Sequence, residues 1–343
     1  MASPLIRCIA LAAMTLGCGQ VELDQTGREC PCGEDFKCDA ICKVCVPRSA
    51  ALGAACPEKA DACVPKVTFT DFKVDWVTPN AIRWRWTPDG DATSLTQDFQ
   101  SYSLVLTSKG KTLVYDVSTN PELGLAVLPN SGVDLTNGSI TGDLEAGMTY
   151  SATLTARDTA GCEFAASNTA PTTPTPTSQS PIEIFGESAF GGTIVDGTVV
   201  TTGCHLGQQC LRTDTCTLDP DAGKAACTKN LRVTGVDIGT GALTQGAFLQ
   251  AYLEFYARTD TSAPSYYSTV FFEVGPEFYR FEGFTFPAST GYRRVQIPLR
   301  VLSSAQGLLD FATLQSLHVS QFNFGTHVAE GAHTWVDEVY IRW

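Results

Sequence analysis

The chain has 343 residues, of which 43% are hydrophobic and only 17% charged, and its formal net charge is −13. This length exceeds that of one average domain, and the hydrophobic fraction is sufficient for packed cores. An acidic chain without a basic run repels phosphate backbones and anionic lipid, which argues against nucleic acid as a partner.

The first residues, MASPLIRCIALAAMTLGCGQ, have the pattern of an export signal. Arg7 precedes an apolar run that is too short to span a bilayer, which takes roughly 20 apolar residues. The ending TLGC resembles a bacterial lipobox, although Thr15 stands where Leu is usual. The resemblance implies a signal peptide over residues 1–17, lipid attachment to Cys18 and the outer membrane or cell surface as location. An ordinary cleaved signal is the alternative.

Fourteen cysteines are spread unevenly along the chain. Apart from Cys8, which leaves with the signal, and Cys18, an even number remains, as suits an oxidising compartment. The segment 18–65 is too short for an apolar core of its own, so we expect disulfides to supply its order. It resembles the short Cys-rich modules that follow the anchor in secreted bacterial proteins. The spacings CDAIC and CKVC also fit zinc, an alternative that a reducing compartment would favour.

The number of cysteines in each part of the chain also predicts which of them form disulfides. After Cys18, the segment 18–65 holds an odd number of cysteines, so one of them needs a partner elsewhere. Cys162 stands alone in the sequence and Cys63 lies just before the next domain, so we predict a Cys63–Cys162 disulfide. The remaining cysteines of the segment would pair among themselves. The group from Cys204 to Cys227 is expected to form two bridges in a stapled surface loop, which caps a binding face or resists proteolysis.

Residues 66–169 predict short antiparallel strands. In AIRWRWTP three large apolar residues alternate with two arginines, as in a strand with one buried face. YSLVL and YSATLTAR repeat the alternation, and TPDGD and LPNSG are typical of turns. The order resembles a fibronectin type III domain, matched here by Trp84 or Trp86, Tyr102, Leu144, Gly147 and Tyr150. The resemblance implies a β-sandwich that serves as a spacer or binding scaffold and has no chemistry of its own.

In a fibronectin type III domain the loop near Gly161 would lie at the pole where the chain enters, which would bring Cys162 within reach of Cys63. After this domain the stretch TAPTTPTPTSQSP breaks all periodicity. Repeated Pro and Thr favour an extended, semi-rigid spacer, so we interpret residues 170–181 as a linker.

Residues 182–343 again predict β-structure, in the segments FLQAYLEFYAR, STVFFEVG, FYRFEGFTF, YRRVQIPLR, SLHVSQFNFG and WVDEVYIRW. Only LLDFATLQSL fits a helical turn or two. The set resembles the jelly-roll sandwich of carbohydrate-binding modules and galactose-binding-like domains, on the strength of LEFYA, YRRVQIPL and WVDEVYI. The whole chain is therefore expected to be all-β.

Alternation within these strands predicts one polar, aromatic face opposite the core-facing Leu253, Phe255 and Ala257. Aromatic rings cover the apolar C–H faces of sugars, and Arg, Glu and Gln bind hydroxyls, so this face is predicted to bind carbohydrate. A partly covered outer sheet and a protein-contact face are the alternatives. The predicted ligand-binding residues are Tyr252, Glu254, Tyr256, Arg258, Phe271, Glu273, Arg294 and Gln296.

Some jelly-roll relatives hold a structural Ca²⁺ near the two ends of the domain. That resemblance implies oxygen ligands from Glu183 or Glu187 together with Asp337, although no DxDxDG loop is present. No other cofactor is expected. The chain has no GxSxG, HExxH or phosphate-loop motif and only four histidines, so we expect no enzymatic activity.

These features together predict an exported, membrane-anchored lipoprotein that displays a non-catalytic binding domain for polysaccharide or another glycan. Anchor, stapled segment, spacer domain, linker and distal domain follow one another in the order that such a role needs. A structural or adhesion protein whose C-terminal sandwich binds another surface protein is the alternative.

Overall fold

The structure is a computed structural model, and it describes residues 36–38, 45–48, 64–91, 93–128, 136–176, 181–186, 193–215, 227–235, 243–260, 267–274, 277–288, 291–316 and 319–343. The signal segment, Cys18, Cys63 and Glu187 lie outside these ranges, so what we predict for them stays a prediction. Two compact units divide the chain, Met1–Cys63 and Val64–Trp343.

A short antiparallel hairpin is the described part of the first unit. It pairs β1 (Phe36–Cys38) with β2 (Cys45–Pro47) and places Cys38 opposite Cys45. Both cysteines are disulfide-bonded. That disulfides give the whole Cys-rich segment its order stays a prediction.

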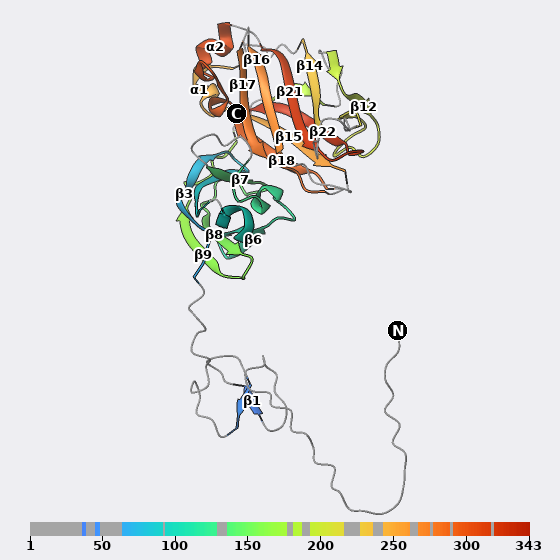
Figure 1. The fold of residues 1–343 in the computed structure, drawn as a ribbon. Coiled ribbons are helices and arrows are strands. Elements are labelled where there is room, and N and C mark those ends of the chain that lie inside the picture. Colours follow the sequence, from blue (N-terminus) through green and yellow to red (C-terminus); the bar gives the residue numbers. More distant parts are fainter. Residues whose placement is uncertain are drawn as a thin grey trace, which may run out of the picture. The chain divides into compact units, whose positions relative to one another are not determined.

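The second unit begins with a β-sandwich, drawn in blue to green in Figure 1. One sheet has the order β3-β4-β7 and the other β6-β5-β8-β9. The strands are β3 (Thr68–Val77), β4 (Ile82–Asp89), β5 (Phe99–Ser108), β6 (Lys111–Tyr115), β7 (Asn137–Thr141), β8 (Ser151–Asp158) and β9 (Glu163–Thr169), with a π-helical turn at Ser94–Asp98 and a 3₁₀ turn at Pro121–Gly124. This is the strand order of a fibronectin type III domain, which confirms the predicted fold.

Period-two alternation builds the core of this sandwich. Trp84 and Trp86 point inward from β4 and are fully buried, and Tyr102 and Leu104 meet them from β5. The rings of Trp86 and Tyr102 lie edge to face, with 5.1 Å between centroids. Each such side chain contributes about 1.5–3 kcal/mol by leaving water, so these few residues carry much of the stability of the domain.

The corner before β8 is fixed by Tyr150. Its hydroxyl accepts a hydrogen bond from the backbone N–H of Glu145 at 2.8 Å, a tyrosine corner that closes the turn. Gly147 within the turn has φ +75°, a conformation that L side chains rarely adopt. The predicted Gly147 and Tyr150 therefore hold the positions that the family pattern implies.

One carboxylate ties the entry of this domain to the loop between β8 and β9. Asp158 accepts the backbone N–H of Cys162 at 2.8 Å and that of Lys66 at 3.2 Å. The loop and the entry of the chain therefore lie at the same pole, as expected. Cys162 is disulfide-bonded, and its predicted partner Cys63 lies outside the described residues.

The first part of the Pro/Thr segment is packed against this sandwich. Thr173 is buried, and its backbone N–H donates to Met148 O at 2.8 Å while its carbonyl accepts from Gly147 N at 3.0 Å. Its hydroxyl donates to Glu145 O at 3.1 Å. Thr173 thus fixes the start of the predicted linker to the corner before β8, while residues 171, 172 and 174–176 around it are exposed.

The second sandwich, yellow to red in Figure 1, consists of two sheets. One has the order β12-β13-β22-β15-β18 with β10 also paired to β22, and the other has the order β11-β14-β21-β16-β17-β19-β20. The strands of the first sheet are β10 (Ile182–Phe185), β12 (Thr198–Val200), β13 (Cys210–Arg212), β15 (Tyr252–Thr259), β18 (Arg293–Pro298) and β22 (Thr334–Arg342). Those of the second are β11 (Thr193–Asp196), β14 (Cys227–Thr234), β16 (Tyr267–Val274), β17 (Glu277–Phe284), β19 (Ser303–Ser304), β20 (Gly307–Leu308) and β21 (Val319–Val328).

Helices contribute little to this sandwich. Among its described residues the helices are α1 (Gln245–Phe248), α2 (Phe311–Ser316), which falls in the predicted LLDFATLQSL segment, and the 3₁₀ turn η4 (Leu299–Val301). Within the described ranges, no helix combines the length and the apolar character that crossing a membrane takes. The expectation of an all-β chain with two sandwiches is confirmed.

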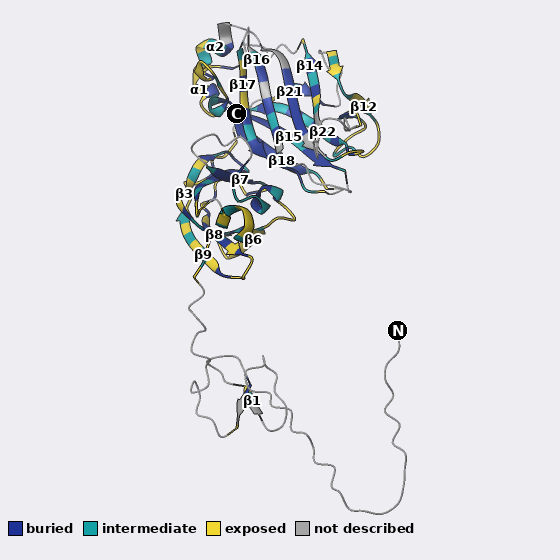
Figure 2. Cartoon of the chain, viewed as in Figure 1, coloured by how far each residue is buried: buried dark blue, intermediate teal, exposed yellow. Residues whose placement is uncertain are grey.

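Each sandwich has its own hydrophobic core, and apolar residues of the first also pack into the core of the second. Trp76, Ala81 and Ile140 of the first sandwich belong to the same buried cluster as the core of the second. The ring of Trp76 meets that of Phe281 edge to face, with 6.1 Å between centroids. Figure 2 shows the buried residues of the second sandwich reaching to this junction. The second unit therefore behaves as one packed body rather than two domains on a flexible tether.

A buried ion pair lies at the centre of this junction. Glu122, fully buried, receives two hydrogen bonds from Arg293, Nη2 to Oε1 at 3.0 Å and Nη1 to Oε2 at 3.2 Å. Ser139 donates to the same carboxylate at 2.8 Å, and Thr285 also donates to it. Burial alone would raise the pKa of Glu122, but the Arg293 charge and these hydrogen bonds outweigh it and hold the pKa below its ordinary value.

Candidate functional site

The prediction that eight ligand-binding residues share one face is wrong. Six of them lie on β15 and β18, in the six-stranded sheet, whereas Phe271 and Glu273 lie on β16, in the seven-stranded sheet. Strands that follow one another in sequence here belong to opposite layers of the sandwich. The two outer faces must therefore be considered separately.

Glu254 is part of the internal framework of the six-stranded sheet. The residue is 2% exposed, and its carboxylate accepts from Arg294 Nε at 2.9 Å, from Arg342 Nε at 2.6 Å and from the Gln296 amide. All three donors lie on the neighbouring strands β18 and β22. Because its hydrogen-bonding capacity is used within the sheet, Glu254 has little left for a ligand.

The first sandwich covers one end of this face. The amide oxygen of Gln296 accepts from Thr78 Oγ1 at 2.7 Å and from Asn80 N at 3.0 Å, and Gln296 has no exposed surface. Tyr252, on the same face, is 3% exposed. A covered outer sheet, one of the alternatives read from the sequence, therefore describes this end of the face.

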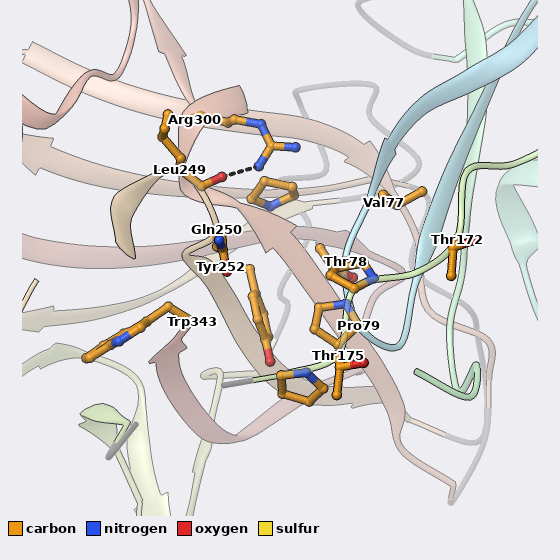
Figure 3. Close-up of a pocket in the computed structure, with 13 residues that line it drawn as sticks. Val77, Thr78, Pro79, Thr172, Thr175, Leu249, Gln250, Tyr252, Arg300 and Trp343 are labelled. Atoms are coloured by element: carbon orange, nitrogen blue, oxygen red, sulfur yellow. Dashed lines mark hydrogen bonds between the residues drawn. The ribbon is translucent and has the colours of Figure 1, made fainter. Parts of the chain in front are cut away.

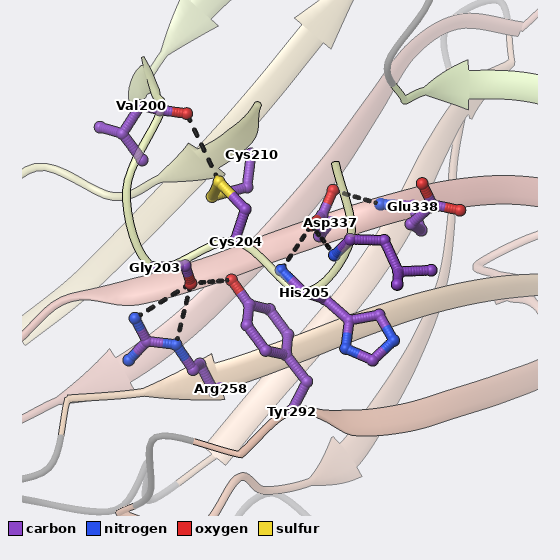
Figure 4. The surroundings of a disulfide bond; sticks show 10 residues. Val200, Gly203, Cys204, His205, Cys210, Arg258, Tyr292, Asp337 and Glu338 are labelled. Carbon is purple, nitrogen blue, oxygen red and sulfur yellow. Dashed lines mark hydrogen bonds between the residues drawn. A yellow bond between two sulfur atoms is a disulfide. The ribbon is translucent and has the colours of Figure 1, made fainter. Parts of the chain in front are cut away.

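A loop at residues 201–209 covers the other end (Figure 4). It is closed by the disulfide Cys204–Cys210, one of the two bridges predicted for this cysteine group. The ring of His205 stacks on Tyr256 with 4.0 Å between centroids and 16° between planes. The ring of Tyr256, which was predicted to contact a ligand, is thus covered by the ring of His205. The loop closed by the disulfide therefore covers this end of the face.

Arg258 and Asp337 hold this loop from the sheet below. Arg258 donates from Nε and Nη2 to Gly203 O at 3.3 and 3.2 Å, and its guanidinium lies 3.9 Å from the centroid of the Trp335 ring. Asp337, fully buried, accepts the backbone N–H of His205 at 2.8 Å. Burial lowers the pKa of His205 although the Asp337 charge opposes the shift, so the stacked imidazole is neutral at pH 7.

The Ca²⁺ prediction does not fit Asp337. Its Oδ2 accepts the N–H groups of His205 and Leu206 and its Oδ1 that of Glu338, so hydrogen atoms occupy the positions that a cation would need. In the described residues the only grouping of metal-ligand type joins Asp337 to Cys204 and Cys210, whose sulfurs form the disulfide. A role for Glu183 or Glu187 stays a prediction.

The outer face of the seven-stranded sheet, which we call the polar face, is arranged differently. Cross-strand register forms one row from Asn230, Gly325, Thr269 and Glu282, and a second from Arg232, Asn323, Phe271 and Arg280. A third row contains Gln321, Glu273 and Phe278. The inward residues between them, such as Phe272, Phe322 and Phe324, form the core.

Several side chains of the polar face are exposed to solvent. Of the aromatic side chains whose burial is described, Phe278 alone is exposed, at 50%. Arg280 beside it is 63% exposed and Arg232 36%, each paired to one acid, Glu282 and Asp196. Such a strip offers an apolar ring next to charged hydrogen-bonding groups.

An unsatisfied amide lies in the middle of the polar face. Asn323 is 3% exposed, and its Nδ2 has no hydrogen-bond partner among the described residues. A buried donor without a partner costs about 1–3 kcal/mol, so its presence calls for a compensating role. Gly325, two residues on, is buried, and a Cβ there would lie 3.0 Å from Thr269 Cγ2 and 3.1 Å from Asn230 Oδ1, so these side chains cover it.

Sequence analysis missed most of this face. It singled out Phe271 and Glu273 but not Asn230, Arg232, Phe278, Arg280 or Asn323. The alternation in FYRFEGF and SQFNFG carries the signal for Arg280 and Asn323, because it places them between core aromatic residues. It does not tell which of two sheets stays open to solvent.

Comparisons with known proteins give structural similarity alone. Neither a protein-family model nor a curated protein matches the sequence. A family 30 carbohydrate-binding module is 17% identical, with a TM-score of 0.32, and the match covers 48% of this chain and 88% of that one. The family 11 carbohydrate-binding module of a cellulosomal cellulase of Clostridium thermocellum is 11% identical, with a TM-score of 0.31. That match covers 48% of this chain and 93% of the module. A two-domain fibronectin type III segment of chicken tenascin is 14% identical, with a TM-score of 0.21 and coverage of 69% and 85%. Our fold assignment depends on the strand orders above and not on these matches.

Proposed function

We propose that this chain is an exported lipoprotein whose C-terminal sandwich binds carbohydrate, without cleaving it, on the polar face of the seven-stranded sheet. The observation that carries the proposal is the buried Nδ2 of Asn323, which has no partner among the described residues, in a face that also presents an exposed ring and two arginines. Sugars need apolar contact and several hydrogen bonds at once, which this combination supplies.

The contrast between the two faces supports this placement. On the six-stranded sheet Glu254, Arg294, Arg342 and Gln296 bind one another or the first sandwich, and Arg258 binds loop 201–209. On the polar face, hydrogen-bonding capacity is left over. The buried carboxylates Glu122 and Glu254 are each held by arginines, which favours binding over acid–base chemistry.

The test is a glycan array followed by titration of the best oligosaccharide into the full chain. Phe278→Ala should weaken binding at least about fivefold, corresponding to about 1 kcal/mol, because the exposed ring is lost. Asn323→Ala should weaken it similarly while leaving thermal stability unchanged or raised, since it removes a buried Nδ2 that has no partner among the described residues.

Leu206→Ala is the matched control, because it also truncates an exposed apolar side chain (54%) but lies over the opposite sheet. It should bind as the parent chain does. Equal affinity in all three variants would place the site elsewhere. An array without any binding would overturn the carbohydrate proposal and favour a protein partner instead.

The proposed anchor depends on export. Five cysteines are disulfide-bonded, as an oxidising compartment favours: Cys38, Cys45, Cys162, Cys204 and Cys210. We expect mass spectrometry of the native protein to find an N-terminal peptide that begins at a diacylglyceryl-modified Cys18. An intact N-terminus with reduced thiols would contradict both the anchor and the location.

A further inference from the structure

A pocket of about 230 Å³ lies where the two sandwiches meet (Figure 3). The loop between β3 and β4 contributes Pro79, and the segment after β9 contributes Pro174 and Thr175. Tyr252 from β15, Trp343 after β22 and Arg300 from η4 complete the wall. Pockets for drug-sized ligands measure about 300–1,000 Å³, so this one suits a single ring-sized unit.

Arg300 brings an uncompensated positive charge to this pocket. Its Nη1 donates to Leu249 O at 2.8 Å, and no carboxylate among the described residues pairs with it. Burial alone shifts its pKa, which is lowered. Arginines elsewhere in the same sandwich behave differently, since Arg293 pairs with Glu122 and Arg294 with Glu254. A half-buried guanidinium without an acid is unusual in a chain of net charge −13.

Tyr252 brings a free hydroxyl. The residue is 3% exposed, and no hydrogen bond from its side chain is formed within the described part of the chain. Burial raises its pKa to about 12, so the group is a neutral O–H at pH 7, able to donate and to accept. Figure 3 shows its ring extending between Trp343 and the wall formed by Pro79 and Thr175.

The rest of the wall is apolar and ring-shaped. Pyrrolidine rings from both sandwiches and the Trp343 indole, 8% exposed, give flat surfaces of the kind that the C–H faces of a sugar contact. Leu249 at the rim is 60% exposed. A neutral sugar would contact the rings and hydrogen-bond the Tyr252 hydroxyl, but it would leave Arg300 without a counter-charge. A small inorganic anion would pair with Arg300 but would make no contact with the rings.

We infer that the junction pocket binds a carboxylated sugar unit of the hexuronate class, with the carboxylate on Arg300, a ring hydroxyl on Tyr252 and the C–H face against the proline and Trp343 rings. This site is independent of the polar face. It would let the chain contact an acidic polysaccharide at a second point, held by both sandwiches.

The experiment is titration of the full chain with D-galacturonate, D-galactose and acetate, observed by NMR. We expect galacturonate to bind more tightly than both of the others, because only it offers the ring and the carboxylate together. Arg300→Gln should raise its Kd at least about tenfold and remove its advantage over galactose, since a charge-assisted hydrogen bond is lost. Arg300→Lys keeps the positive charge, so galacturonate should still bind this variant somewhat more tightly than galactose does.

Two further variants complete the design. Tyr252→Phe removes only the hydroxyl and should weaken galacturonate several-fold without unfolding the chain. Arg157→Gln neutralises an exposed arginine of the first sandwich (52% exposed) and should leave galacturonate binding unchanged. Equal binding of galactose and galacturonate, no binding of either, or unchanged affinity in Arg300→Gln would overturn this site. The glycan array decides on the polar face separately, so failure of one proposal leaves the other standing.

Discussion

Replacing Glu122 with Ala lowers the free energy of unfolding by about 3–5 kcal/mol, the largest single effect that we expect in this chain. The substitution leaves Arg293, 9% exposed, buried between the two sandwiches without its counter-charge. It also removes the acceptor of the Ser139 and Thr285 hydroxyls. Because the lost group lies at the junction, both sandwiches should lose stability together.

Urea unfolding of the full chain measures this effect. Glu163→Ala is the control, since Glu163 pairs with Arg157 on the surface and such pairs contribute about 0–1 kcal/mol. The double variant Glu122→Ala/Arg293→Ala should cost less than the sum of the single changes, because no buried charge is then left alone. A Glu122→Ala chain as stable as the Glu163→Ala control would show that the junction does not hold the sandwiches together.

Acid should weaken the same junction. The pKa of Glu122 in the folded chain lies below its ordinary value of 4.5, so its ionised form stabilises the fold at neutral pH. That stabilisation is lost as the pH falls through the folded pKa, when the carboxylate becomes protonated. Between about pH 6 and pH 3 the parent chain should therefore lose more stability than Glu122→Gln, which has no proton to gain there.

Glu254→Ala gives the second large effect, a loss of about 2–4 kcal/mol with glycan affinity unchanged. Arg294 and Arg342 lose the carboxylate that they share, and Gln296 loses an acceptor. The cost is smaller than at Glu122 because water reaches both arginines, which are 23% and 35% exposed. The pKa of Arg294 reflects the same pairing. Burial lowers this pKa, but the charge of Glu254 and its hydrogen bond to Arg294 outweigh burial, so the pKa is raised above its ordinary value.

Thermal unfolding and oligosaccharide titration of Glu254→Ala distinguish a framework role of this residue from a ligand-binding role. Glu145→Ala, which breaks an exposed pair with Lys111, is the stability control. If Glu254→Ala instead kept its stability and lost glycan binding, the ligand role predicted from the sequence would be restored and the framework role would be wrong.

Alternation and turn residues made the elements predictable. Trp84, Trp86 and Tyr102 stand at period two, and Gly147 and Tyr150 mark a corner, so the first sandwich could be recognised residue by residue. The strand segments of the second sandwich were found in the same way. These features depend on neighbours in sequence, which is why they can be read without a structure.

The placement of faces could not be predicted in this way. Alternation assigns each strand two sides but does not tell which sheet the strand joins, so Glu254 on β15 and Glu273 on β16 were predicted to share a face. The junction depends on Glu122 and Arg293, which are 171 positions apart with no local pattern around either. Only the tertiary arrangement shows that one face is covered and the other open.

Hydrogen exchange of the full chain, with and without the oligosaccharide that binds best on the array, is the sharpest test of where carbohydrate binds. If the polar face is the site, added sugar slows exchange in β16, β17 and β21 and leaves β15, β18 and loop 201–209 unchanged. Protection confined to β15, β18 and that loop would refute binding on the polar face and return the site to the six-stranded sheet.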